Sequence, residues 1–356
     1  LWSMLRLPFV ALARRRERRA RAQLIDGLRA HERGEYLRAE QLLKQAAEND
    51  EGGGLARIHA ARAATARGDE AAATAHVDAL GERDASSQAI LRAQHALTLG
   101  NPTDALAALD APRAQPLPPR GLRLRAEALA ASGRSFEAYG LLGALRQQQA
   151  LPAPRLETLQ AQWAAQSLQQ AGNASELADR WDALPQTVQT TASVVAAYAT
   201  RAAAMGWNEA ATRTLEQALD RQWDEDLAAL YGQLDVARLV ERRAQAEAWL
   251  QAHPSSPALL LAVARLDKAQ GHLPQAERAL HRAIAQGAGS GAWEALGDIA
   301  SQSGDEPRAR LAYANALRSQ RGAALLDLPG RDLRQQIADT AAIEERDAHG
   351  IPRLRG

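Results

Sequence analysis

The sequence predicts an all-α fold: an α-solenoid of about nine helix-turn-helix repeats that form a superhelix with a concave groove. Three observations predict it. Glycine turns recur at a nearly constant spacing, small residues recur in register on both sides of each turn, and alanine and leucine dominate the apolar content. Such a composition favours closely packed helices, because alanine has the highest helix propensity and lets backbones approach. It disfavours sheets, which prefer β-branched and aromatic residues.

Glycines followed by a turn-forming residue mark each repeat. They stand at Gly34, Gly68, Gly100, Gly133, Gly172, Gly206, Gly271 and Gly304, with spacings of 34, 32, 33, 39, 34, 65 and 33 residues. The step of 65 holds two periods, and we expect the missing turn at Leu239. A period near 34 is typical of the tetratricopeptide repeat, a pair of helices joined by a tight turn.

Three columns of residues support this period. Five residues after each turn a small residue such as Ala105 recurs, nine residues after it a larger one such as Leu109, and seven residues before it a small one such as Ala93. In the repeat without a glycine, the first two columns predict Ala244 and Ala248. Small residues let the two helices of a pair cross closely, and stacking of successive pairs then buries the core.

The chain divides into three predicted parts: a basic juxtamembrane arm (1–22), the repeat solenoid (23–318) and a C-terminal capping helix with a tail (319–356). The first repeat helix is expected over 18–33 and the polar capping helix over 331–346. Proline-rich loops at 112–119 and 147–154 fall between repeats, where insertions are tolerated.

Charge is concentrated at the start of the chain. Residues 1–22 hold seven arginines and one glutamate, whereas the rest holds 36 basic and 41 acidic side chains. The solenoid is therefore not a general polyanion binder, and we expect no nucleic-acid partner. The chain has no cysteine, which excludes disulfides, zinc-thiolate sites and cysteine nucleophiles.

The N-terminal arm joins a short apolar stretch to an arginine cluster. Residues 1–13 are too few to span a bilayer, which takes about 20 apolar residues. An apolar end followed by arginines is what remains on the cytoplasmic side of a membrane helix. We therefore expect the arm to contact an anionic membrane surface through Arg14, Arg15, Arg16, Arg18 and Arg19. A solvated amphipathic helix and a nucleic-acid-binding arm are the alternatives.

A polar column on the first helices predicts the binding groove. Six residues before each turn, eight of the nine positions are polar. The candidate protein-binding residues are Arg62, Gln94, Glu127, Gln166, Gln233, Arg265 and Asp298. Long polar side chains at these positions suit hydrogen bonds to a bound peptide or helix, although simple solvation explains them equally well.

No catalytic or metal-binding arrangement stands out in the sequence. The glycine-rich run 287–291 follows a helix, whereas a dinucleotide-binding loop follows a strand. The acidic run 224–226 is placed to cap a helix N-terminus. Eight histidines lack metal-ligand spacing. We predict no enzyme, no metal and no cofactor, with haem binding kept as a secondary hypothesis.

The combination of an apolar and arginine-rich start, a first helix that runs directly into Gly34-Glu35-Tyr36, and an alanine-rich repeat array resembles the HemY family of proteobacterial inner-membrane proteins. The resemblance implies that two membrane helices, absent from this sequence, anchor the protein with its solenoid on the cytoplasmic side of the bacterial inner membrane. It further implies a scaffold for late haem-biosynthesis enzymes such as ferrochelatase.

Three functions follow as hypotheses. The first is this haem-pathway scaffold, and a general peptide-binding adaptor of the cell envelope is its alternative. The second is a carrier of haem or a porphyrin, for which His59, His95, His272 and His281 are the candidate axial ligands. The third, an enzyme, lacks any catalytic signature.

Overall fold

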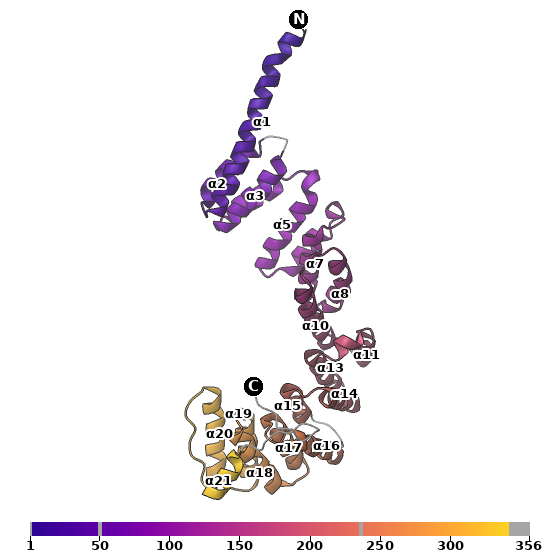
Figure 1. Cartoon of the computed structure of the whole chain (residues 1–356), viewed down its shortest axis with the longest axis vertical. Coiled ribbons are helices and arrows are strands. Elements are labelled where there is room, and N and C mark those ends of the chain that lie inside the picture. Colours follow the sequence, from indigo (N-terminus) through magenta and orange to yellow (C-terminus); the bar gives the residue numbers. More distant parts are fainter. Residues whose placement is uncertain (1, 49–51, 235–237, 342–356) are drawn as a thin grey trace. The chain divides into compact units, whose positions relative to one another are not determined.

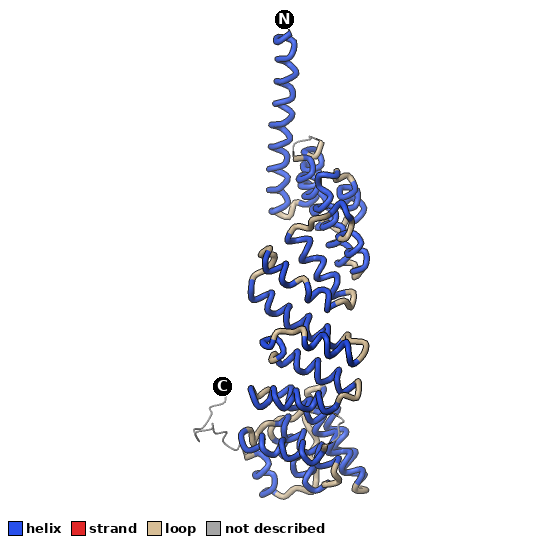
Figure 2. The backbone as a smooth tube through the Cα atoms, turned by 90° about the vertical axis from the view of Figure 1, so that its right-hand side faces the viewer, coloured by secondary structure: helices blue, strands red, loops and turns tan. Residues whose placement is uncertain are grey.

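The computed structural model describes the backbone of residues 2–48, 52–234 and 238–341, and the side chains of those ranges from Arg15 onward. The described part is built of helices joined by short turns, with no strand (Figure 2). The chain forms two compact units, Leu1–Trp163 and Ala164–Gly356, and each is described by itself. The predicted all-α fold is confirmed.

The first unit is a series of consecutive helices (Figure 1). They are α1 (Trp2–Glu32), α2 (Tyr36–Ala46), α3 (Gly53–Ala66), α4 (Glu70–Asp78), α5 (Ala85–Thr98), α6 (Pro102–Leu109), α7 (Pro119–Ala131), α8 (Ser135–Gly140) and α9 (Leu142–Gln147), with 3₁₀ turns at Glu82–Asp84 and Pro112–Ala114. The helices pack in the pairs α1–α2, α3–α4, α5–α6 and α7–α8, and each second helix except α8 also packs on the next first helix.

Helix α10 (Ala153–Gln169) spans the boundary of the two units. The second unit continues with α11 (Ala174–Asp182), α12 (Gln186–Gln189), α13 (Ala192–Ala204), α14 (Asn208–Arg221), α15 (Glu225–Gln233), α16 (Leu239–Ala252), α17 (Pro257–Ala269), α18 (Leu273–Ala285), α19 (Ser290–Gln302), α20 (Glu306–Gln320) and α21 (Leu333–Thr340). The pairs α13–α14, α17–α18 and α19–α20 pack closely, and α21 lies on α18.

Seven of the eight predicted glycine turns share one geometry. Gly34 has φ 77°, the Gly34 amide donates to the His31 carbonyl, and the Glu35 amide donates to the Ala30 carbonyl. This is the Schellman helix end, in which a left-handed residue lets two amides satisfy the last carbonyls. Positive φ recurs at Gly68, Gly100, Gly133, Gly206, Gly271 and Gly304. Glycine recurs at these turns because a side chain disfavours that φ.

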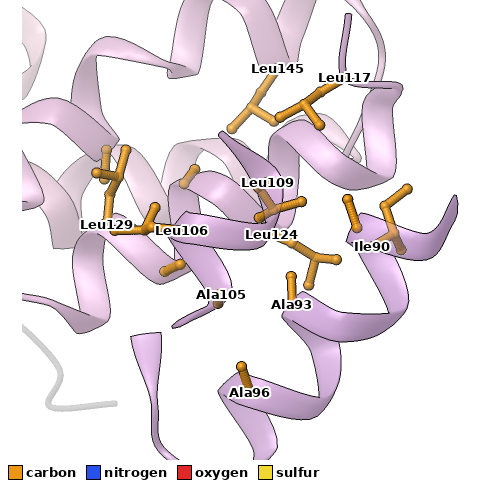
Figure 3. Close-up of a cluster of buried hydrophobic side chains, with 14 of the residues drawn as sticks. Ile90, Ala93, Ala96, Ala105, Leu106, Leu109, Leu117, Leu124, Leu129 and Leu145 are labelled. Carbon is orange, nitrogen blue, oxygen red and sulfur yellow. The ribbon is translucent and has the colours of Figure 1, made fainter. Parts of the chain in front are cut away.

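The columns of small residues form the core of the first unit. Ala93 on α5 and Ala105 on α6 are fully buried, and Leu109 fills the space beside them. Figure 3 shows these side chains with Leu124 on α7 and Leu145 on α9 in one apolar cluster. The predicted packing of each pair against the next is therefore confirmed here.

The predicted turn at Gly172 lies between α10 and α11, as expected, but its geometry differs: Gly172 is not left-handed, and its amide donates to the Glu176 side chain. The expected start of the first helix at residue 18 is wrong. That helix begins at Trp2, so the expected boundary at residue 22 falls inside α1. A helix within the expected range 331–346 is present as α21, which begins at Leu333; residues 342–346 lie outside the described residues.

The prediction for the repeat that lacks a glycine is also wrong. Leu239 is the first residue of α16 rather than a turn, and the preceding Arg238 has φ 65°. Ala244 and Ala248, the predicted packing residues, are exposed. The buried residues of α16 are instead Arg242, Ala246 and Trp249. The buried face of α16 is therefore displaced by two residues from the expected register, and it includes the charged side chain of Arg242.

Candidate functional site

The predicted groove column lies on the first helix of each pair. In the first unit, Ala61 on α3, Ala93 on α5 and Ala126 on α7 are buried. The next residue on a helix is rotated by about 100°, which places Arg62, Gln94 and Glu127 at the edge of the buried stripe. All three are partly exposed. The small packing residue thus fixes where the polar side chain points.

Three successive first helices bring polar groups together in this unit. The Arg120 Nη2 on α7 donates to the Gln94 Oε1 on α5 at 3.0 Å. Burial and the nearby Arg120 charge lower the pKa of Arg62 on α3. Arg120 was not predicted from the column. It lies seven residues before Glu127, two helical turns away on the same face, and that spacing is the signal that could have found it.

Glu127 forms an ion pair within its own helix, with Arg123 on α7. The Arg123 Nε lies 3.7 Å from the Glu127 Oε1, too far for a hydrogen bond. This buried Nε has no hydrogen-bond partner among the described residues. The site in the first unit therefore carries the cations Arg62, Arg120 and Arg123 and the anion Glu127.

The second unit places Arg265 on α17 and Asp298 on the neighbouring helix α19. Burial lowers the pKa of Arg265, and its Nη1 is buried without a hydrogen-bond partner among the described residues. Burial alone would raise the pKa of Asp298, but hydrogen bonds from Lys268 at 2.7 Å and Tyr313 at 2.8 Å leave it lowered. Asp298 is thus already satisfied, whereas Arg265 retains a free donor.

The other two predicted groove residues are less informative. Gln166 lies partly buried on α10. Gln233 is exposed as the last residue of α15, next to the repeat whose predicted register is wrong. A role of the predicted groove residues in binding remains a prediction.

The four candidate histidines lie in different surroundings. His59 on α3 has its pKa lowered by burial and by Arg62. His95 lines a cavity of about 300 Å³ between α3, α4, α5 and α6, together with the apolar Val77 and Leu99. His272 is half-exposed at the start of α18. These positions make His95 the histidine that lies beside apolar space.

His281, the fourth candidate, is enclosed by charged groups. Its Nε2 lies 3.3 Å from the Arg308 Nη2 and 3.6 Å from the Glu277 Oε1. Burial lowers the pKa of His281, and Arg331 adds to this shift. A ligand on this nitrogen would have to displace both neighbours.

The arginines of the arm lie on α1, the long first helix whose N-terminal half extends past α2 (Figure 1). Arg15, Arg16, Arg18 and Arg19 are exposed, and the side chain of Arg14 lies outside the described side chains. Within the residues that the structure describes, no helix combines the length and the apolar content needed to cross a membrane.

Metal ligands do not gather in the described part of the chain: its histidines and carboxylates form no group of three or more that could hold an ion. The acidic run 224–226 caps α15, since the Asp224 Oδ1 accepts the Leu227 amide at 2.9 Å. The glycine-rich run 287–291 connects α18 to α19, as predicted.

Comparison with known proteins gives two similarities. No curated protein matches the chain. One chain of the crystal structure of the APC/C hetero-tetramer Cut9-Hcn1 is 15% identical, with a TM-score of 0.32 over 84% of this chain and 66% of that chain. The model of the family described as HemY protein N-terminus matches residues 1–68. These residues comprise α1, α2 and α3 through the turn at Gly68, so the similarity to the HemY family covers the N-terminal part of the chain.

Proposed function

We propose that the chain is a membrane-tethered scaffold that holds other proteins on its first helices, in the service of late haem biosynthesis. The observation that carries the scaffold role is the hydrogen bond from Arg120 on α7 to Gln94 on α5, whose polar column continues with Arg62 on α3, the first helix of the preceding pair. Polar side chains presented by consecutive repeats suit an extended or helical partner. The match of residues 1–68 to the family described as HemY protein N-terminus supports the haem-pathway setting.

The N-terminal arm supports the proposed attachment to the membrane. Exposed arginines on α1 match the anionic headgroups of a cytoplasmic leaflet, and we place the solenoid on that side of the bacterial inner membrane. No enzymatic role is proposed, because the sequence carries no catalytic signature.

Site-specific crosslinking tests the scaffold. A photo-crosslinking residue at Gln94 should capture ferrochelatase or another late enzyme of porphyrin synthesis in intact membranes. The same residue at Arg134, an exposed position on α8's N-cap, is the matched control and should capture none. Capture of unrelated envelope proteins alone would favour the alternative, a general peptide-binding adaptor without a haem role.

A haem or porphyrin carrier is the second candidate, supported by His95. Its ring lies beside a cavity with apolar walls, and a neutral imidazole is a suitable axial ligand. Titration with haemin should give a saturable Soret shift that His95→Ala abolishes and His272→Ala leaves unchanged. A titration that does not saturate would contradict the carrier function and leave the scaffold standing.

A further inference from the structure

Several arginines of the first unit are neutralised by carboxylates. Arg67 pairs with Glu40 at 2.7 Å, Arg125 with Asp110 at 2.7 Å, and Arg134 with Glu137 at 2.6 Å. Arg62 and Arg120 differ. Neither forms an ion pair with a carboxylate of the described residues; Arg120 is bonded to the neutral Gln94.

Arg120 on α7 reaches Gln94 on α5, and α5 packs against α3, which carries Arg62. Two guanidinium groups on neighbouring helices repel each other, and partial burial of Arg62 weakens the screening by water. A single carboxylate between them would relieve the repulsion and accept forked hydrogen bonds from each guanidinium, the geometry that arginine favours.

Two neighbours define the rest of the ligand. The Gln94 Oε1 is occupied by Arg120, which leaves the Gln94 amide nitrogen to donate to a peptide carbonyl. Leu55 lies seven residues before Arg62 on α3, on the same helix face, and is 46% exposed. An apolar side chain of the ligand, next to its carboxylate, would cover Leu55.

We propose that the first-helix face of the first unit binds an acidic peptide segment of a partner protein, with a carboxylate held between Arg62 and Arg120 and an adjacent apolar side chain on Leu55. This inference rests on the proposed scaffold function and names the chemistry of its partner. A peptide is favoured over a polyanion because the same polar column carries the anion Glu127 and residues 23–356 carry more acidic than basic side chains.

The test uses the full chain and two short labelled peptides, one of alternating leucine and glutamate and a twin with glutamine in place of glutamate. We expect the acidic peptide to bind at least about tenfold more tightly, since charge-assisted hydrogen bonds exceed neutral ones by that order. The double variant Arg62→Gln/Arg120→Gln should lower the affinity for the acidic peptide to that of its twin and leave helicity and melting temperature unchanged.

The matched control is Arg125→Gln/Arg134→Gln, which removes the same charge from paired arginines. Its affinity should stay within about twofold of the unmodified chain. Equal loss in both double variants would overturn the inference, because net charge alone would then explain binding. Competition by a single-stranded oligothymidylate as strong as that by the acidic peptide would overturn it in favour of a general polyanion site.

The two proposals fail in different ways. If both peptides bind equally and Gln94→Ala weakens both, the acidic preference is wrong and the groove still holds peptides. If neither peptide binds and crosslinking from Gln94 captures no protein, the inference and the scaffold function are both wrong.

Discussion

The guanidinium of Arg242 lies 4.9 Å from the ring centre of Tyr231, donates to the Tyr231 carbonyl and reaches the Leu234 carbonyl at 3.2 Å. Arg242 is only 2% exposed. Its two terminal nitrogens thus satisfy carbonyls at the C-terminal end of α15, which a helix cannot satisfy itself. Burial and a hydrogen bond to Glu216 raise the pKa of Tyr231, so the ring beneath the arginine stays neutral.

Substitution of Arg242 should destabilise the second unit. Neither Arg242→Met nor Arg242→Lys can bond both carbonyls, and we expect each to lower the free energy of unfolding by about 2–4 kcal/mol. Urea unfolding followed by circular dichroism measures this. Arg238→Gly is the control in the same segment. It should stabilise the chain by about 1 kcal/mol, because glycine adopts a positive φ without cost. A neutral Arg242→Met would contradict the structural role.

Arg242 also explains where prediction from the sequence fails. The turn glycines could be predicted because a left-handed backbone at the end of a helix favours glycine, and this preference shows at a single position of the sequence. The register of α16 could not be predicted, because its buried face includes an arginine that a hydrophobic pattern counts as exposed. Gly232 on α15 is a second example. A Cβ at this position would lie 2.5 Å from Ala262 on α17, so Gly232 allows α15 to pack on α17 and not, as predicted, on α16, the second helix of its own repeat.

The candidate site also combines features that the sequence predicts with a contact that it does not. Arg62 and Gln94 could be found from their distance to the turn, since each lies on one helix at a fixed phase. The pairing of Arg120 with Gln94 depends on how α7 packs against α5, and spacing within one helix does not determine that contact.

Gly297 on α19 should tolerate no side chain. A Cβ there would lie 2.6 Å from the Tyr313 ring on α20, so in Gly297→Ala either this ring or the two helices of the last repeat must shift. We expect a loss of about 1–3 kcal/mol in the free energy of unfolding. Gly143→Ala in α9 meets nothing within 4 Å and should stabilise by up to about 1 kcal/mol through helix propensity. Equal effects of the two substitutions would contradict the close approach.

The docking of α21 on α18 should weaken in mild acid. His281 faces Arg308, Glu277, Arg331 and Asp339, and burial, supported by Arg331, keeps its pKa below the ordinary 6.5. As the pH falls, His281 is protonated in the unfolded chain at a higher pH than in the folded chain. The stability that is present above about pH 6.5 is therefore lost as the pH falls below that value. Urea unfolding at about pH 7.5 and about pH 5.5 should show the loss, and His281→Gln should reduce it. An unchanged pH dependence in the variant would contradict this account.

The arginine arm should bind anionic vesicles. Each arginine near an anionic surface contributes on the order of 1 kcal/mol, and this attraction should weaken with added salt, since the Debye length is about 8 Å at physiological ionic strength. Neutral vesicles should bind the chain little. Cosedimentation with phosphatidylserine vesicles, at low and high salt, measures the binding.

The matched variant changes Arg14, Arg15, Arg16, Arg18 and Arg19 to glutamine. It should lose vesicle binding and retain helicity and melting temperature, because the described arginines of this group are exposed on α1 and form no ion pair with the described residues. The adjacent Ala20 is buried, so packing of α1 begins just past the substituted positions. If the five substitutions unfolded the first unit, these arginines would belong to its packing, and the proposed contact with the membrane surface would lose its support.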